Sequence, residues 1–229
     1  MVKLSVILPT YNERENLPEL IAQIRRLPIE VECVVVDDNS PDGTGEVADR
    51  LALRDPLIKV IHRPRKAGLA SAVYAGLSKA SAPYLAVMDA DLQHPPHLLA
   101  QMLRYLENGY DMVVASRYVR GGGVIGWTIP RHIISRVATL LAHLTIPRSR
   151  VVKDPMSGYF ALKREILESV KIDPSIGYKL LLAILVKGKC FKIKEVPMVF
   201  RRRLRGESKL NEKEVLTYLK LLLNLLKQR

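Results

Sequence analysis

Short, mostly apolar runs alternate with longer amphipathic stretches along the first half of the chain. The runs lie at residues 4–8, 33–36, 58–61, 84–88 and 112–115. Runs of this length, bounded by turn-forming residues, are typical of buried strands in a parallel sheet. The pattern therefore predicts five such strands.

The stretches between these runs carry the period of an α-helix. The first has one apolar face, made by Leu17, Leu20, Ile21 and Ile24. Asn12 with Glu15 three residues later matches a capping box, so we expect this helix to start at Asn12. Similar helices are predicted after Thr44, Gly68 and Pro96. Strands and helices that alternate through right-handed crossovers form an open doubly wound α/β sheet, whose ligands bind beyond the carboxyl ends of the strands.

Beyond residue 116 the pattern predicts a glycine-rich loop, a helix at 131–146, a hairpin region and a terminal helix at 213–229. The helix at 131–146 has apolar residues at helical spacing, which are Ile133, Ile134, Val137, Leu140, Leu141 and Leu144. This face either packs on the domain or lies on anionic lipid headgroups, to which the adjacent Arg131, Arg148 and Arg150 would be attracted.

The terminal helix has a second apolar stripe, made by Val215, Leu216, Leu219, Leu222, Leu223 and Leu226. Such a stripe can bind lipid, self-associate or contact a separate membrane subunit. No apolar run reaches the roughly 20 residues that cross a bilayer, and the N-terminus has no secretion signal. We therefore expect a cytoplasmic protein that is peripheral on the cytoplasmic face of a membrane.

The charge balance predicts a polyanionic partner. The 229 residues include 36 Lys and Arg against 23 Asp and Glu, a net charge of +13. Nucleic acid, anionic lipid and nucleoside diphosphates all fit this charge. With 6% aromatic residues and no reader motif, a basic nucleic-acid binding domain is only a remote alternative, and we expect no nucleic-acid partner. The two isolated cysteines, Cys33 and Cys190, make neither a disulfide framework nor a zinc cluster.

Asp89 and Asp91 directly follow the predicted strand at 84–88 and share one face through their i, i+2 spacing. Two carboxylates this close repel each other unless a cation lies between them. Mg²⁺ or Mn²⁺ accepts one or two carboxylates together with phosphate oxygens of a substrate, and Gln93 can add a neutral oxygen. A solvated turn that caps the next helix explains the same residues without a metal.

A second acidic pair, Asp37 and Asp38, ends the predicted strand at 33–36. Consecutive side chains point to opposite faces, so one acid can meet a nucleoside while its neighbour braces the loop. Acids in this position often accept hydrogen bonds from ribose or base, but turn chemistry before Pro41 and Gly43 explains them equally well.

Several motifs together resemble the family 2 glycosyltransferases. Four occur in the order seen in that family: Pro9-Thr10-Tyr11-Asn12-Glu13, Val36-Asp37-Asp38, Asp89-Ala90-Asp91-Leu92-Gln93 and Arg205-Gly206-Glu207-Ser208-Lys209. Within the family the chain is most similar to the polyprenyl-phosphate (dolichyl-phosphate) mannosyltransferases, through His94-Pro95-Pro96, Ser116-Arg117-Tyr118 and Asp154-Pro155-Met156-Ser157-Gly158-Tyr159-Phe160.

The resemblance implies a GT-A type, Rossmann-like open mixed sheet flanked by helices. A catalytic domain would cover residues 1–212 and include the helix at 131–146, and an amphipathic helix would cover 213–229. The implied nucleotide-sugar site comprises Pro9, Tyr11, Glu13, Val36, Asp38, Asp89, Ala90, Asp91, Gln93, Lys179, Arg203, Ser208 and Lys209. Asp89, Asp91 and Gln93 would hold Mg²⁺ or Mn²⁺, and Asp91, Arg117 and Arg131 would serve catalysis.

The implied reaction is an inverting, metal-dependent transfer of mannose from GDP-mannose to dolichyl or another polyprenyl phosphate. Arg117 and Arg131 would bind the acceptor phosphate, because a planar guanidinium donates two parallel hydrogen bonds to phosphate. That phosphate is already an anion at neutral pH, so no general base is required. UDP-glucose or another nucleotide sugar is the alternative donor, since a transferase that uses one would have nearly identical acidic motifs.

Two other features have plainer interpretations. The glycines of residues 121–126 satisfy a dinucleotide fingerprint but lie late in the predicted sheet, so we interpret them as a flexible acceptor loop. The histidines show no metal-binding spacing, and we expect His94 to be an ordinary surface or loop residue.

Overall fold

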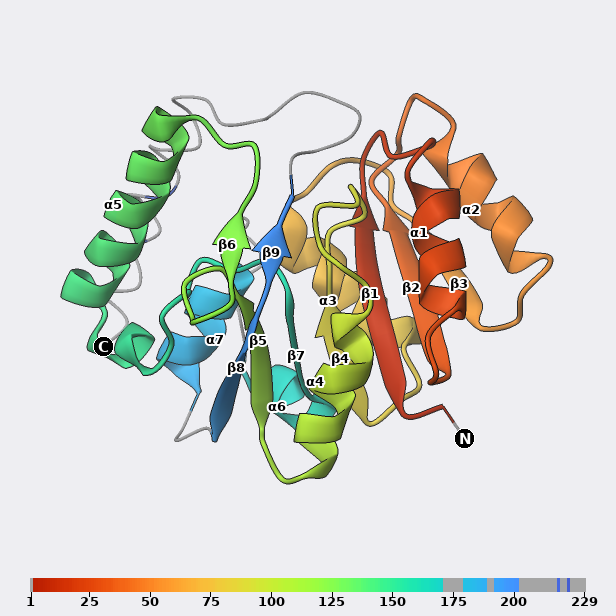
Figure 1. Ribbon diagram of the computed structural model, residues 1–229. Helices are drawn as coiled ribbons and strands as arrows, with labels where there is room; N and C mark the ends of the chain where they lie inside the picture. Colours follow the sequence, from red (N-terminus) through yellow and green to blue (C-terminus); the bar gives the residue numbers. More distant parts are fainter. Residues whose placement is uncertain (1, 171–178, 189–191, 202–217, 219–221, 223–229) are drawn as a thin grey trace.

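The computed structural model describes residues 2–170, 179–188, 192–201, 218 and 222. Within these residues, seven strands form one sheet in the order β3-β2-β1-β4-β7-β5-β8 (Figure 1). The strands are β1 (Leu4–Thr10), β2 (Val31–Asp37), β3 (Ile58–His62), β4 (Tyr84–Val87), β5 (Met112–Ser116), β7 (Phe160–Lys163) and β8 (Ile193–Pro197). The five predicted strands are confirmed as β1 to β5, and the predicted α/β class is confirmed with them.

The sheet is mixed because β7 runs antiparallel between β4 and β5. The neighbouring pairs β1–β2, β1–β4, β2–β3 and β5–β8 are all parallel. A small parallel pair, β6 (Gly123–Val124) and β9 (Val199–Phe200), lies beside the main sheet. The glycine-rich segment that we expected to be a flexible loop therefore contains a paired strand.

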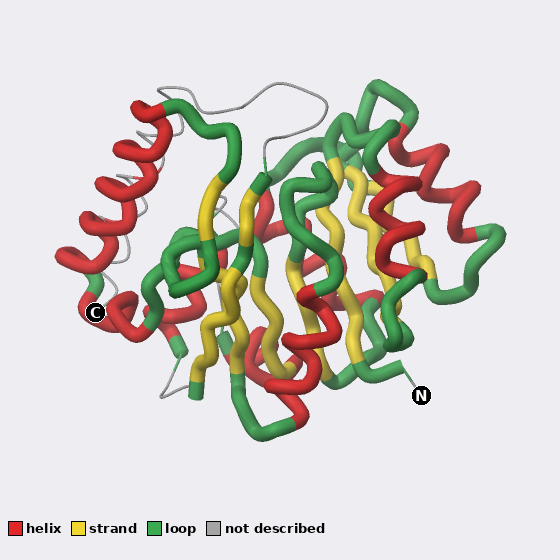
Figure 2. Tube along the Cα trace, viewed as in Figure 1, coloured by secondary structure: helices red, strands yellow, loops and turns green. Residues whose placement is uncertain are grey.

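Helices cover both faces of the sheet, as Figure 2 shows by colour. They are α1 (Leu17–Arg25), α2 (Thr44–Ala52), α3 (Leu69–Lys79), α4 (Leu98–Glu107), α5 (Ile129–Thr145), the 3-10 helix η1 (Pro147–Val151), α6 (Arg164–Ser169) and α7 (Leu180–Lys187). Alternate strand residues feed two separate cores. Val34 and Val36 face the core under α3, α6 and α7, whereas Cys33 and Val35 face the core under α1, α2 and α4. Burial on both faces explains the continuous apolar runs, since each buried Val or Ile contributes about 1.5–3 kcal/mol.

The predicted start of the first helix is wrong. Asn12 has a left-handed backbone with φ of 60°, and its N–H donates to the Ser40 hydroxyl at 3.1 Å. The helix begins only at Leu17, after Asn16, whose side-chain amide donates to the Glu13 carboxylate at 2.7 Å. The intervening turn connects the carboxyl ends of β1 and β2, a tertiary contact that overrides the local capping pattern.

Helix α5 stands at one end of the molecule, away from the sheet (Figure 1). It begins two residues before the predicted start, with Pro130 in its first turn, and ends at Thr145, one residue before the predicted end. Most of its apolar side chains are exposed, including Ile133, Leu140 and Leu144. Packing on the domain therefore does not bury this face among the described residues.

The predicted helix at 213–229 lies outside the described residues, except for Tyr218 and Leu222. Both of these side chains are buried in the core under α3, α6 and α7. The Tyr218 hydroxyl donates to the Ala138 carbonyl of α5 at 2.6 Å. At least Leu222 of the predicted apolar stripe is therefore covered by the chain itself. No helix within the described parts of the chain is long and apolar enough to cross a membrane.

Candidate active site

The carboxyl ends of β1 and β2 bring the first group of predicted site residues together. Asp37 accepts hydrogen bonds from the Thr10 hydroxyl at 3.1 Å and from the Ser40 backbone N–H at 3.0 Å. The Asp38 backbone N–H donates to the Thr10 carbonyl at 3.1 Å, which ties the two strand ends together. Asp37 thus braces the turn.

Asp38 is not an isolated carboxylate. Arg63, which directly follows β3, lies 3.1 Å from it, and both side chains are almost fully buried. Burial raises the pKa of the Asp38 carboxyl, and the charge of Arg63 opposes this rise. On the same edge, the Lys66 ammonium lies 4.4 Å from the centre of the Tyr11 ring. The basic run at residues 63–66 is the sequence signal for this part of the site, and it was not among the predicted site residues.

Other residues of this group are largely enclosed. The Val36 side chain is fully buried in the core, so only its backbone is available to a ligand. Glu13 is 7% exposed, and its carboxylate accepts the hydrogen bond from Asn16 that orients the start of α1. Pro9 and Tyr11 are half-buried at the end of β1 and beyond it.

The acidic turn after β4 is built to a fixed shape. Leu92 has a left-handed backbone with φ of 61°, an uncommon conformation for a residue with a branched side chain. The Asp91 carboxylate accepts the Gln93 backbone N–H at 3.1 Å, and the Gln93 side-chain amide donates to the Arg201 carbonyl at 2.8 Å. Asp91 and Gln93 are buried, whereas the Asp89 side chain is 43% exposed.

His94 belongs to this turn, as the alternative of a loop histidine predicted, but the alternative of a surface histidine is wrong. Its ring is 2% exposed, stacks on Tyr159 at 5.2 Å and meets the edge of Phe200 at 5.4 Å. Its Nδ1 accepts the Asp89 backbone N–H at 3.1 Å, which places the ring proton of the neutral form on Nε2. His94 therefore fixes the backbone from which Asp89 projects.

The donor set of this turn fits a hard divalent cation. Asp89 and Asp91 offer carboxylate oxygens, and the amide oxygen of Gln93 stays available as an acceptor while its nitrogen is hydrogen-bonded. Within the described residues, no group of three or more His, Cys, Asp or Glu side chains converges. Two carboxylates and one amide oxygen match the small number of protein ligands that Mg²⁺ takes when it also binds a substrate phosphate.

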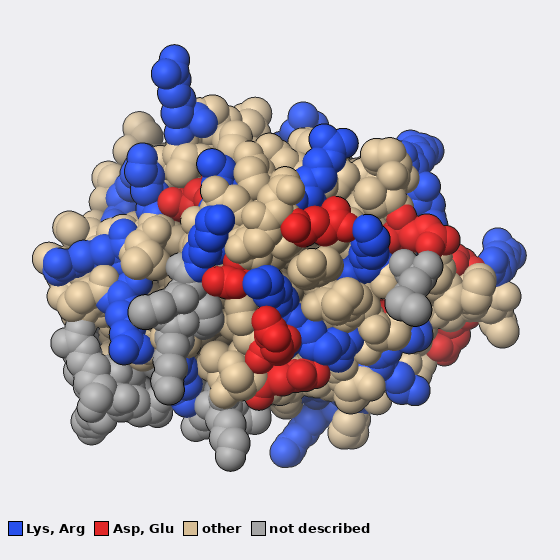
Figure 3. All heavy atoms as spheres, turned by 90° about the horizontal axis from the view of Figure 1, so that it is seen from below, with Lys and Arg blue, Asp and Glu red and all other residues tan. Residues whose placement is uncertain are grey.

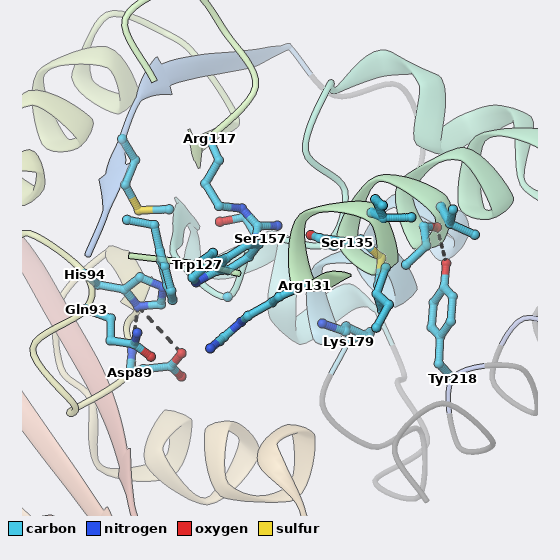
Figure 4. Close-up of a pocket in the computed structure, with 18 of the residues that line it drawn as sticks. Asp89, Gln93, His94, Arg117, Trp127, Arg131, Ser135, Ser157, Lys179 and Tyr218 are labelled. Atoms are coloured by element: carbon cyan, nitrogen blue, oxygen red, sulfur yellow. Dashed lines mark hydrogen bonds and ion pairs between the residues drawn. The ribbon is translucent and has the colours of Figure 1, made fainter. Parts of the chain in front are cut away.

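A cavity of about 540 Å³ extends from this turn along α5. Figure 4 shows Asp89, Gln93 and His94 at one end, Tyr218 at the other, and Arg131 and Lys179 between them. Beyond Arg131, α5 lines the cavity with Ile134, Val137, Ala138 and Leu141, and the carbonyl of Ala138 accepts a hydrogen bond from the hydroxyl of Tyr218. The cavity therefore has a charged end and an apolar end.

Arg117 lines this cavity but is already engaged by Asp154. Asp154 is fully buried and accepts three hydrogen bonds from Arg117, from Nη2 at 2.7 Å, from Nε at 2.8 Å and from the backbone N–H at 3.0 Å. Burial alone would lower the pKa of the Arg117 guanidinium, but these bonds outweigh it and raise the pKa. The sequence pattern assigned no role to Asp154, although this residue opens one of the motifs that carry the family resemblance.

Arg131 reaches the same region from the first turn of α5, and its guanidinium lies 4.5 Å from the centre of the Trp127 ring. Lys179 lines the cavity from the residue before α7. Of the predicted site residues, Asp89, Gln93, Arg117, Arg131 and Lys179 share this one cavity. Arg203, Ser208 and Lys209 lie outside the described residues.

Comparison with known proteins places the chain in a family. A model described as glycosyl transferase family 2 matches residues 5–171. The dolichol-phosphate mannosyltransferase of Pyrococcus furiosus is 47% identical over 228 residues, which cover 99% of this chain but 64% of the relative. The polyprenol monophosphomannose synthase of Mycolicibacterium smegmatis is 40% identical over 223 residues, covering 90% of this chain and 80% of that protein. The chain therefore spans less than two thirds of the length of the first of these relatives.

Solved structures confirm the GT-A type fold. Glucosyl-3-phosphoglycerate synthase from Mycobacterium tuberculosis, in complex with Mn²⁺, UDP and glucosyl-3-phosphoglycerate, matches with a TM-score of 0.75 at 21% identity, over 99% of this chain and 80% of that one. A mannosyltransferase from Pyrobaculum calidifontis, in complex with GDP-Man and Mn²⁺, matches with a TM-score of 0.63 at 21% identity, over 90% and 58%. Since the family model covers most of the chain and one relative is 40% identical over most of both proteins, the chain belongs to the family 2 glycosyltransferases.

Proposed function

We propose that the protein transfers mannose from GDP-mannose to a polyprenyl phosphate such as dolichyl phosphate, in an inverting reaction that requires Mg²⁺ or Mn²⁺. The observation that carries this proposal is the two-ended cavity. A lipid phosphate needs cationic groups for its head and an apolar wall for its chain, and the cavity offers both in one continuous space. The names of the two curated relatives support the same substrates.

Different groups of residues contact the nucleoside, the acceptor phosphate and the divalent cation in this reaction. Asp38 and Tyr11 contact the nucleoside at the ends of β1 and β2. Arg131 binds the acceptor phosphate at the charged end of the cavity, and Arg117, held by Asp154, directs its remaining N–H groups toward the same anion. Lys179, which lines the same cavity, contacts the diphosphate of the donor. Asp89, Asp91 and Gln93 would hold the divalent cation, which supplies positive charge to the departing nucleoside diphosphate.

Bond formation needs little beyond this positioning. A phosphate oxygen of the acceptor attacks the anomeric carbon, the bond from that carbon to the diphosphate oxygen breaks, and the diphosphate leaves with the electron pair. The acceptor is an anion at neutral pH, so no proton has to be removed. Attack opposite the leaving group inverts the anomeric carbon, and close placement of the two reactants supplies much of the rate.

The same arrangement needs a membrane, because the acceptor is a lipid. We propose that α5 lies on the cytoplasmic surface of a bilayer and that its exposed apolar side chains enter the headgroup boundary. Five of them form one stripe at spacings of three and four, namely Ile129, Ile133, Val137, Leu140 and Leu144. Arg148 and Arg150, which follow α5, are exposed, and their guanidinium groups donate to neutral backbone carbonyls and so keep the positive charge that would attract anionic headgroups.

The direct test is to incubate the protein with polyprenyl phosphate, Mg²⁺ or Mn²⁺, and GDP-mannose or UDP-glucose, and to look for labelled lipid. We expect mannosyl lipid with GDP-mannose, none in chelated buffer and none with Asp91→Ala. Arg131→Ala should mainly raise the KM for the acceptor. Efficient transfer from UDP-glucose would support the alternative donor, and full activity of Asp91→Ala in chelated buffer would remove the metal from the proposal.

A nucleic-acid binding domain fits the structure less well. On the face shown in Figure 3, Lys and Arg side chains are interspersed with Asp and Glu, so the net positive charge does not form one basic stripe there. Backbone recognition of nucleic acid requires a continuous basic surface. Steeply salt-dependent oligonucleotide binding would support a nucleic-acid partner instead.

A further inference from the structure

Trp127 lies between the two arginines that face the acceptor phosphate. It sits on the segment that joins β6 to α5, and the guanidinium carbons of Arg131 and Arg117 lie 4.5 Å and 5.4 Å from its ring centre. The edges of Phe200 and His132 pack on the ring at 5.6 Å and 5.5 Å. The indole is therefore held in place by two aromatic neighbours and contacts both cations.

Packing alone does not account for a tryptophan here. Its indole N–H is buried, and within the described residues nothing accepts a hydrogen bond from it. A buried unpaired donor costs about 1–3 kcal/mol, a cost that phenylalanine would avoid at the same position. What indole offers over phenylalanine is a face with stronger attraction for cations.

A π face holds a guanidinium differently from a carboxylate. Asp154 positions Arg117 but also neutralises its charge, which weakens its attraction for a phosphate. An aromatic ring attracts the Arg131 guanidinium while leaving its positive charge uncompensated by the ring.

We propose that Trp127 is a positioning residue that sets the places of Arg131 and Arg117 for the phosphate of the acceptor. This inference rests on the proposed function, because it assumes that these arginines bind a lipid phosphate. It predicts that the electron density of the indole ring controls the affinity for the acceptor and leaves the affinity for the donor unchanged.

The chain offers a clean test, because Trp127 is its single tryptophan. Protein made with 5-fluorotryptophan or a difluorinated analogue changes this one ring, keeping the N–H and nearly the same shape. We expect the KM for polyprenyl phosphate to rise with each fluorine, to roughly fivefold in total, while the KM for GDP-mannose stays constant. Trp127→Phe protein made in the same media should show no dependence on the analogue.

A matched variant separates this role from general packing. Tyr110→Leu removes a similar contact, in which the Lys192 ammonium lies 4.7 Å from the Tyr110 ring, just before β5 and away from the cavity. We expect Trp127→Leu, and not Tyr110→Leu, to raise the acceptor KM. Equal changes in the KM for both substrates would overturn the inference.

Calorimetric binding of a short isoprenyl phosphate without donor separates the role of Trp127 from the proposed function. Wild-type protein should bind it, and Trp127→Leu should bind it several-fold more weakly. If both bind equally well, the inference about Trp127 fails while the proposed function stands. If the wild type binds none, the proposed function fails and this inference fails with it.

Discussion

At the scale of single residues, the buried Arg117–Asp154 pair constrains how mutations at the site should be interpreted. The two side chains are 9% and 0% exposed, so removing one partner leaves a buried charge without compensation. We expect Arg117→Met to lower the free energy of unfolding by about 3–5 kcal/mol, and the double variant with Asp154→Leu to recover most of it. Denaturant unfolding measures both. Loss of activity in an Arg117 variant alone therefore does not identify a phosphate ligand.

The exposed pair Lys3–Glu107 provides the control for this experiment. Its side chains are 64% and 35% exposed, so Lys3→Met should cost far less than Arg117→Met, because solvent screens an exposed ion pair. If Arg117→Met is no more destabilising than Lys3→Met, the pair is not the buried contact that we describe.

The lowered pKa of Glu32 predicts how the free energy of unfolding depends on pH. Burial raises the pKa of its carboxyl, but hydrogen bonds from Lys59, Ser5 and Ser81 outweigh burial and lower the pKa to about 2. A lowered folded-state pKa contributes stability that is present above the unfolded pKa, near 4.5, and is lost as the pH falls toward 2. Glu32→Gln should therefore cost on the order of 3 kcal/mol at pH 7.

The cost of Glu32→Gln should shrink between pH 4.5 and pH 2, because the wild-type carboxyl becomes protonated over this range. Urea unfolding of both proteins at pH 7, 4.5 and 3 measures the difference. A difference that stays constant down to the lowest pH at which both proteins fold would contradict the assignment.

At the scale of elements, α5 links the cavity to a surface. One side of the helix lines the cavity with Ala138 and Leu141, and its exposed side carries Leu140 and Leu144, which are 56% and 61% exposed. An acceptor chain leaving the apolar end of the cavity would follow the helix into lipid. If the acceptor chain takes this path, one side of α5 contacts the chain in the cavity and the other side contacts the lipid that the chain enters.

Acidic substitutions on this face should weaken membrane binding without unfolding the protein. We expect Leu140→Glu with Leu144→Glu to reduce retention on anionic vesicles at least tenfold, because each change removes buried apolar area and adds repulsion. Vesicle flotation at low salt measures retention. Leu53→Glu is the matched control, since Leu53 follows α2 and is 87% exposed far from α5. If the double variant, the Leu53→Glu control and the wild type are all retained equally on vesicles, α5 is not the element that contacts the membrane.

At the scale of the whole molecule, the sequence predicted the sheet better than the site. Runs such as residues 33–36 are buried on both faces, so their strands follow from composition alone. Strand β7 escaped prediction because its four residues give no readable period and its place between β4 and β5 depends on distant pairing. Asp89 and Gln93 were predicted from a motif, and Arg131 from the family resemblance. Asp154, His94 and Trp127 act through contacts between segments far apart in the sequence, which no local spacing displays.

Donor binding joins the ends of β1, β2 and β4, so it should stabilise the whole fold. A ligand at a hundred times its Kd adds about 2.7 kcal/mol, which for a domain of this size corresponds to a rise in Tm of roughly 5–10 °C. We expect this rise with GDP and Mn²⁺ together, and a much smaller one with GDP in chelated buffer. Asp91→Asn should abolish the dependence on Mn²⁺, yet it keeps the oxygen that accepts the Gln93 N–H.

Thermal unfolding followed by circular dichroism, with UDP in parallel, tests this without any acceptor. An equal rise with and without chelator would show that the acidic turn binds the nucleotide without a cation, and a larger rise with UDP would assign the nucleoside pocket to uridine.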